Sequence, residues 1–212
     1  DQTKANKWPI ITEQDEQAVL DVLRSGDISI HPVVGELEDS YKSLTGRQYA
    51  LSHNNGTAAI LAGLHAIGIQ PYDEVIVQAA TWWSSVMPIL HCGGVPVFAE
   101  IELDTLGLDP AAVEKKITDR TKAIVVVHLF GMPSKMEQLV EVAKKHDLKI
   151  LEDASHAHGA TYKGKPIGSF GDVSVFSMQG NKLCPSGEGG MLLCDSQELW
   201  EAAMRIGHYE RL

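Results

Sequence analysis

Short apolar runs rich in β-branched residues alternate along this chain with segments whose apolar residues recur at helical spacing. The first pattern is typical of buried strands and the second of amphipathic helices. The strand pattern occurs at Gln48–Ser52, Glu74–Gln78, Val95–Ile101, Lys122–His128, Leu148–Glu152, Val173–Ser177 and Gly190–Cys194. The helical pattern lies between most of them, at Gly56–Ile67, Trp83–His91, Pro110–Ile117 and Lys135–His146. Strands that alternate with helices predict an α/β domain with a mostly parallel sheet.

The last two predicted strands break this alternation. Only a loop separates Val173–Ser177 from Gly190–Cys194, and it is too short for a crossover helix. Parallel neighbours need such a crossover, whereas antiparallel neighbours do not. We therefore expect one strand to run antiparallel, which makes the predicted sheet mixed.

Two further helical patterns precede the first strand. Glu13–Arg24 is amphipathic, with Thr12 as a candidate N-cap, and Val34–Leu44 follows it. Both are expected to pack outside the sheet or to reach toward a partner subunit. The predicted organisation is an N-terminal helical segment, 1–46, followed by a large domain, 47–212.

Composition narrows the possible partners. A net charge of −10 leaves no basic stripe for phosphates, so a nucleic-acid partner is not expected. Apolar runs such as Ala123–Val127 are too short to span a bilayer, and the first residues do not resemble a signal peptide. Cys92, Cys184 and Cys194 have no metal-like spacing. A reduced, cytoplasmic protein without a metal and without a membrane partner is the expectation.

Lys182 has the most informative surroundings. It follows the apolar strand Val173–Ser177 and precedes the glycine-rich stretch Ser186–Gly190. A lysine that condenses with a carbonyl group needs a rigid strand to aim it, a polar pocket and space for a bulky partner. The alternative is a solvated loop lysine, so the interpretation as a Schiff-base enzyme depends on further parts of such a site upstream.

A candidate phosphate site lies at the start of a predicted helix. Gly56 permits a tight turn, and the backbone N–H groups of Thr57 and Ala58 are expected to be free and to face outward. Ser177 could add a hydroxyl group to the same phosphate. Asn-Gly-Thr also caps ordinary helices, and Ser177 could be an ordinary strand-end serine. The motif is neither of the glycine fingerprints for dinucleotides or ATP, which argues against a nicotinamide enzyme.

Two other strand ends carry groups that suit an aromatic cofactor. Trp82 and Trp83 follow one strand and could provide a platform for a ring, or one could be a core residue and the other a surface residue. Asp153 ends another strand, where a buried acid needs a partner such as a pyridinium nitrogen. His156 is close enough in sequence to reach the cofactor or the substrate. Together with Lys182, these groups match pyridoxal 5′-phosphate.

The sequence resembles the DegT/DnrJ/EryC1/StrS sugar aminotransferases, within the fold-type I enzymes that use pyridoxal 5′-phosphate. The resemblance covers nearly the whole chain. Its landmarks are Gly56-Thr57-Ala58-Ala59, Glu74–Val77 with Thr81-Trp82, Pro96-Val97-Phe98, Thr121–Ile124, His128–Gly131, Glu152-Asp153-Ala154, and Phe176-Ser177 through Lys182 to Gly187–Gly190. It implies the large domain of that fold, a three-layer α/β sandwich with a seven-stranded mixed sheet, and a homodimer.

The resemblance also implies roles for matching residues. Lys182 would carry the Schiff base, Asp153 would pair with the pyridine nitrogen, and His156 would lie near the phenolic oxygen of the ring. Trp82 would stack on the ring. The phosphate would be held by residues of the predicted turn and by the strand-end serine: Gly56, Thr57, Ala58 and Ser177.

The implied activity is transfer of an amino group from glutamate or glutamine to a keto-sugar or keto-cyclitol. The residues of the motifs Phe176–Gln179 and Ser186–Gly190 most resemble those of the branch that acts on keto-cyclitols and aminoshikimate-type compounds. Relatives that act as sugar dehydratases replace the lysine by histidine. Family members continue into a small carboxyl-terminal domain, which is expected to be missing after Leu212. A dehydratase or lyase, and a truncated non-catalytic cofactor-binding protein, are the alternatives.

Overall fold

The computed structural model describes residues 8–29, 31–208 and 211. Its centre is a seven-stranded sheet in the order β1-β9-β8-β5-β4-β2-β3. The strands are β1 (Tyr49–His53), β2 (Glu74–Gln78), β3 (Val95–Ala99), β4 (Thr121–Val127), β5 (Lys149–Asp153), β8 (Val173–Ser177) and β9 (Gly190–Cys194). Only β9 runs against its neighbours in this sheet, β1 and β8, and the other neighbouring pairs are parallel. The predicted mixed sheet with one antiparallel strand is confirmed.

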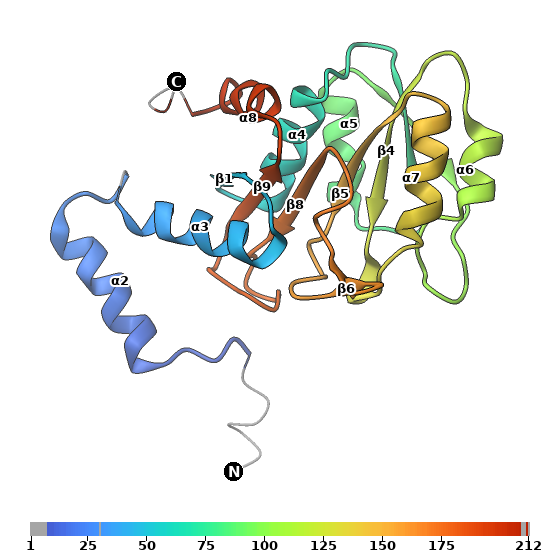
Figure 1. Cartoon of the computed structure of the whole chain (residues 1–212). Helices are drawn as coiled ribbons and strands as arrows, with labels where there is room; N and C mark the ends of the chain where they lie inside the picture. Colours follow the sequence, from blue (N-terminus) through green and yellow to red (C-terminus); the bar gives the residue numbers. More distant parts are fainter. Residues whose placement is uncertain (1–7, 30, 209–210, 212) are drawn as a thin grey trace.

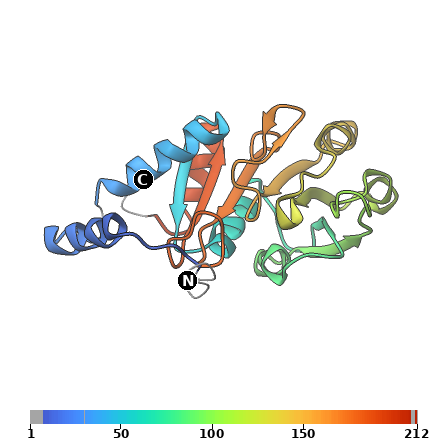
Figure 2. The ribbon, with the colours of Figure 1, turned by 90° about the horizontal axis from the view of Figure 1, so that it is seen from below.

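Helices cover both faces of the sheet (Figure 1). One face packs against α4 (Gly56–Ala66), α5 (Met87–His91) and α8 (Gln197–Met204), and the other against α3 (Val33–Thr45), α6 (Pro110–Lys116) and α7 (Met136–Lys145). Figure 2 shows α3 and α7 on one side of the strands and α4 on the other. The three-layer sandwich is therefore confirmed.

Side chains of each strand alternate between the two layers, as the pleat of a strand requires. In β4, Ile124 and Val126 enter the core beneath α6 and α7, whereas Ala123 and Val125 enter the core beneath α4. A strand that is buried on both faces has apolar side chains on both sides, so apolar and polar residues do not alternate along it. This explains why β4 appears in the sequence as a continuous apolar run.

Beyond one-residue shifts at element ends, the structure differs from the predicted elements in several places. The helix expected over Trp83–His91 is divided into a 3-10 turn, Trp83–Ser85, and the short α5, because Pro88 has no N–H group to continue a helix through the junction. A two-stranded hairpin, β6 (Thr161–Tyr162) with β7 (Lys165–Pro166), was not predicted. The third predicted strand ends at Ala99 rather than Ile101.

The two N-terminal helices differ in how they contact the sheet. In α2 (Glu13–Ser25) the predicted cap is present, with the Thr12 side chain and Asp15 forming a capping box, and none of its residues is buried. Figure 1 shows α2 standing away from the sheet. By contrast, α3 packs on the sheet through Tyr41, which belongs to the main core.

The topology places one set of strand ends together. β1, β2, β4, β5 and β8 point in one direction, so their carboxyl ends meet at the same edge of the sheet. Ligands of open α/β sheets bind at this edge. No helix in the described part of the chain is long and apolar enough to cross a membrane.

Candidate active site at the carboxyl ends of the strands

A cavity of about 630 Å³ opens at the carboxyl ends of the strands. Most of the predicted site residues line it: Gly56, Thr57, Trp82, Asp153, His156, Ser177 and Lys182. They come from the start of α4, the segment after β2, the end of β5 and the end of β8. Segments that are far apart in sequence therefore meet around one space. Ala58 is the exception, since it faces a different cavity.

The start of α4 and the end of β8 form one wall. A methyl group added at Gly56 would lie 2.9 Å from Cβ of Ser177, which is too close for any other residue to fit without movement. Ser177 is only 8% exposed, and Thr57 lines the cavity beside it. This close approach leaves a small-residue cradle at a helix N-terminus, which is a suitable place for a phosphate group.

The expectation of a free N–H group at Ala58 is wrong. The Asn55 side chain caps α4 and accepts a hydrogen bond from the Ala58 N–H at 2.8 Å. An asparagine at the N-cap commonly satisfies one of the first N–H groups of a helix in this way. A phosphate could use the Ala58 N–H only if the Asn55 side chain moved.

Asp153 lines the cavity from the end of β5. Its side chain is 2% exposed, and it accepts hydrogen bonds from the Ser85 hydroxyl at 2.6 Å and the Ser155 N–H at 3.1 Å. Within residues 8–29, 31–208 and 211, no lysine, arginine or histidine forms an ion pair with it. A buried carboxylate normally has a cationic partner. The cavity therefore offers a place for a positively charged ligand atom.

Ser85 is a residue that the sequence analysis missed. It follows the tryptophan pair in the 3-10 turn, and Thr81 in turn lies 3.1 Å from its hydroxyl group. A serine in a helical pattern carries no signal of contact with an acid on another strand. Pro88 was the one signal in the sequence, because it predicts an interruption of the helix. That interruption turns the segment with Ser85 toward the cavity.

Lys182 lies in a loop that is fixed by backbone hydrogen bonds. Met178 and Gly180 donate to the carbonyl oxygens of Gly189 and Gly187 at 2.8 and 2.9 Å, and Lys182 N–H donates to Gln179 at 2.8 Å. The side chain is half-buried. Burial lowers the pKa of the Lys182 amine, and the negative charge of Asp153 opposes part of that effect. The two residues thus act on each other within one cavity.

Neither tryptophan after β2 is a core residue. Trp82 is 63% exposed and Trp83 is 58% exposed, and both line the cavity. This excludes the interpretation in which one of them fills the core. Both indole rings are available to a ligand, which leaves the stacking role of Trp82 as a prediction.

His156 lines the same cavity. Its Nδ1 atom accepts a hydrogen bond from the Phe130 N–H at 3.2 Å. Burial lowers the pKa of His156, and the positive charge of Lys182 lowers it further, whereas Asp153 raises it. Phe130 was part of a family landmark in the sequence, but its contact with His156 was not predicted.

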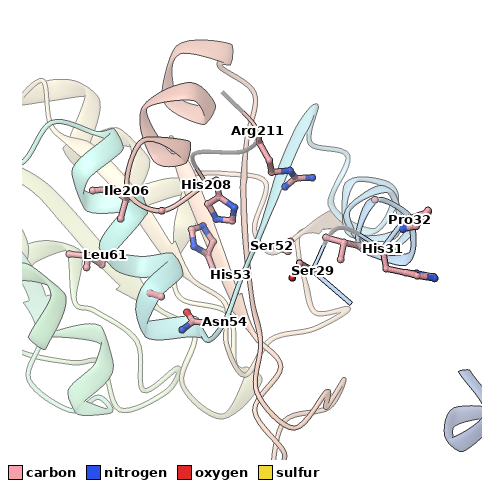
Figure 3. Close-up of a pocket in the computed structure, with 14 residues that line it drawn as sticks. Ser29, His31, Pro32, Ser52, His53, Asn54, Leu61, Ile206, His208 and Arg211 are labelled. Atoms are coloured by element: carbon pink, nitrogen blue, oxygen red, sulfur yellow. The ribbon is translucent and has the colours of Figure 1, made fainter. Parts of the chain in front are cut away.

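A second cavity, of about 780 Å³, is lined in part by Asn54 and Ala58 at the start of α4 (Figure 3). It is enclosed by α3, the end of β1 and the segment after α8. His53 and His208 contact each other there with ring centroids 4.9 Å apart, and the Arg211 side chain pairs with Glu38. None of the lysine and carboxylate chemistry described above reaches it. The smaller cavity is therefore the candidate active site.

The strand order, together with a half-buried lysine and a buried carboxylate at the carboxyl ends of the strands, defines the large domain of a fold-type I pyridoxal 5′-phosphate enzyme. A family model for the DegT/DnrJ/EryC1/StrS aminotransferase family matches residues 9–209. The chain belongs to that family. The resemblance seen in its motifs is thereby confirmed.

Named relatives agree with this assignment. The chain is 42% identical to the spore coat polysaccharide biosynthesis protein SpsC of Bacillus subtilis, over 90% of this chain and 49% of that protein. It is 37% identical to the L-glutamine:scyllo-inosose aminotransferase of Streptomyces griseus, over 95% of this chain and 49% of that protein. Matches to inosose aminotransferases agree with the keto-cyclitol branch. The chain spans about half the length of these relatives.

A solved structure shows the same architecture. The protein described as "Putative sugar aminotransferase Spr1654 from Streptococcus pneumoniae, PLP-form" superposes with a TM-score of 0.88 at 33% identity, over 93% of this chain and 56% of that chain. The PLP in that structure belongs to that protein.

Proposed function

We propose that this chain is the cofactor-binding part of an aminotransferase that uses pyridoxal 5′-phosphate. The observation that carries the proposal is the buried Asp153 carboxylate, without a cationic protein partner among the described residues, in the same cavity as the half-buried Lys182. An acid for a ring nitrogen and an amine for an aldehyde are the two groups that this cofactor requires. Family membership supports the same activity.

The cavity residues fit the parts of the cofactor. The cradle between Gly56 and Ser177, with Thr57 beside it, suits the phosphate. Asp153 suits a protonated ring nitrogen, and the exposed face of Trp82 suits the ring. When bound, pyridoxal phosphate supplies an electron sink for the carbon that gains or loses the amino group.

Lys182 has two tasks in this proposal. Its amine would hold the cofactor through the aldehyde group, and as a free base it would move a proton to and from the reacting carbon. An ordinary lysine is protonated at neutral pH and is a poor base. Burial lowers the pKa of Lys182, which makes the free amine more accessible.

The proposed donor is glutamate or glutamine and the proposed acceptor is a keto-sugar or keto-cyclitol. Support comes from the relatives, which include the L-glutamine:scyllo-inosose aminotransferase of Streptomyces griseus. A dehydratase or lyase remains the alternative, although the presence of Lys182 favours transamination. Measuring amino transfer against loss of water from the same keto-sugar separates the two.

Two finer proposals concern the setting of the enzyme. We propose a homodimer, and the exposed apolar residues of α2, including Val19 and Leu23, offer surface for a second copy. We also propose a cytoplasmic location, because Cys92, Cys184 and Cys194 are all free thiols. Light scattering across a concentration series tests the first proposal, and a monomer at every concentration would contradict it.

The central experiment is the visible spectrum of the purified chain with pyridoxal phosphate. We expect an absorbance band of the lysine-bound cofactor that glutamine or glutamate bleaches. Lys182→Ala should abolish the band, and Lys122→Ala, an exposed lysine at the opposite end of β4, should retain it. A band that survives Lys182→Ala would refute the proposed role. A band that no donor bleaches would favour the non-catalytic alternative.

A further inference from the structure

The turn Leu129–Gly131 packs directly against His156. The Phe130 N–H donates to His156 Nδ1 at 3.2 Å, and the two rings are stacked with an interplanar angle of 11° and centroids 6.1 Å apart. A methyl group on Gly131 would lie 2.9 Å from the backbone oxygen of His156. Backbone and ring of this turn thus contact three different parts of one histidine.

The backbone of this turn is unusual. Phe130 has φ 54° and ψ 21°, and Gly131 has φ 82°, so two successive residues are left-handed. For a residue with a large side chain this conformation costs on the order of 1 kcal/mol and persists only where surrounding contacts impose it. The contacts here are those with His156, so the turn and the histidine hold each other in place.

The hydrogen bond determines which ring nitrogen carries the proton. An N–H donor requires an acceptor, so Nδ1 is unprotonated and Nε2 carries the hydrogen of the neutral ring. In the part of the chain that the structure describes, no protein group accepts a hydrogen bond from His156 Nε2. A histidine on the wall of the cavity therefore has one donor that the protein leaves unused.

Burial and nearby charges keep the imidazole ring of His156 neutral. Burial and the positive charge of Lys182 lower the pKa of His156, and the negative charge of Asp153 only partly opposes them. His158, the other nearby imidazole, has a pKa lowered to about 4 by burial, by the positive charge of Lys182 and, at a pH where His156 is protonated, by the charge of His156. At neutral pH, His156 is consequently a donor at one atom and not a cation.

We propose that the Phe130–Gly131 turn is a positioning element that holds His156 as its neutral Nε2–H tautomer, so that the ring presents a single hydrogen-bond donor to an oxygen of the bound ligand. The Nε2–H group needs an acceptor, so the ligand atom is a phenolate or carbonyl oxygen. An ammonium group would place its own N–H donors against Nε2–H. The identity of that ligand rests on the proposed function; the positioning of the ring does not.

The test is nitrogen NMR of the cofactor-free chain labelled with ¹⁵N in histidine and in the backbone. His156 is assigned from the signal lost in His156→Gln. The expected result is a neutral ring with its hydrogen on Nε2 and a scalar coupling across the hydrogen bond between Phe130 N and His156 Nδ1. A wild-type ring that carries its hydrogen on Nδ1 overturns the proposal without any mutation of the turn.

Gly131→Ala should release the ring, because the added methyl group must push the turn away from His156. We expect the Nδ1–H tautomer to appear and the pKa of His156 to rise. The matched control is Gly159→Ala, another left-handed glycine (φ 73°) near His156 whose added methyl group would contact nothing within 4 Å. Identical His156 spectra and titrations in the two variants would overturn the positioning role.

Binding of pyridoxal phosphate tests the donor itself. His156→Gln keeps an N–H donor and should bind with a dissociation constant within about threefold of wild type, whereas His156→Leu should bind about tenfold more weakly. Equal affinity of the leucine variant and the wild type would overturn the donor role. If no variant and no wild-type chain bound the cofactor, the proposed function would fail, while the tautomer measured without cofactor would still decide the positioning of the ring.

Discussion

Glu152 and Asp153 are adjacent carboxylates at the end of β5, and they lie in contrasting surroundings. The pleat turns their side chains to opposite faces of the sheet. Glu152 is fully buried, and its oxygens are surrounded by protein donors: the N–H groups of Gly168, Phe170 and Gly171 at 3.0, 2.7 and 2.7 Å, His128 Nε2 at 3.3 Å, and the Arg47 guanidinium at 3.7 Å.

Asp153 accepts two hydrogen bonds and faces a cavity. A carboxylate has about four lone-pair positions, so Asp153 retains capacity that Glu152 does not. The difference separates a structural acid from one that can serve a ligand. A buried acid whose acceptor positions are filled by the protein stabilises the fold, whereas one with spare capacity at a cavity is a candidate for binding.

Removing the structural acid should have the largest effect on stability. Glu152→Ala leaves His128 and three N–H groups without their acceptor, and breaking a buried network of this kind costs about 3–5 kcal/mol. Urea unfolding followed by circular dichroism measures this loss. A change below about 1 kcal/mol would mean that the network is not structural and would remove the contrast with Asp153.

Asp153→Asn should weaken cofactor binding and leave the stability of the fold nearly unchanged. The substitution keeps the size of the side chain, so the unfolding free energy should change by less than about 1 kcal/mol. The dissociation constant for pyridoxal phosphate should rise by about tenfold to a hundredfold, as expected for a lost charged hydrogen bond. Fluorescence titration of the two chains provides the comparison, and unchanged affinity would contradict the role of Asp153.

Gly56→Ala tests the cradle on the same side of the sheet. The methyl group would meet Cβ of Ser177 at 2.9 Å, and forced overpacking costs about 1–3 kcal/mol. Gly35→Ala in α3 is the control, because its added methyl group contacts nothing within 4 Å and alanine favours helices. Thermal unfolding should show opposite shifts for the two variants, and equal shifts would count against the close approach of α4 and β8.

The smallest expected effect is the contribution of Glu152 to the loss of stability in acid. Burial alone would raise the pKa of Glu152, but the hydrogen bonds from His128, Gly171 and Gly168 outweigh it and hold the pKa below its ordinary value of 4.5. A depressed pKa stabilises the folded state above the ordinary value, and this contribution is lost as the pH falls through the folded pKa. Each unit by which folding lowers the pKa contributes about 1.4 kcal/mol to the unfolding free energy. Below pH 4.5 the unfolding free energy should therefore fall more steeply in wild type than in Glu152→Ala.

Much of the fold was predictable because it depends on local patterns. The alternation of strands and helices, the Thr12 cap of α2 and the antiparallel strand near the carboxyl end follow from spacing and loop length. The undivided helix before β3 was wrong because the periodicity of its side chains outweighed Pro88 in the interpretation. The β6–β7 hairpin has strands of two residues, which are too short to show alternation.

The candidate site was predictable only in part. Asp153 and Ser177 end strands and Lys182 follows one, so their meeting at one edge of the sheet follows from parallel topology. The contacts of Ser85 with Asp153 and of Phe130 with His156 join segments 68 and 26 positions apart. Such contacts depend on how loops pack, and no spacing rule reports them. The capped Ala58 N–H likewise depended on the rotamer of Asn55.

The sequence by itself determined which segments form strands and helices, and that Glu152 and Asp153 must point to opposite faces. Hydrogen bonding along the backbone and the period of each element are sufficient for that. Only the tertiary structure decided which of the two faces a cavity. The space beside Asp153 and the donors around Glu152 come from distant segments whose positions are fixed by packing.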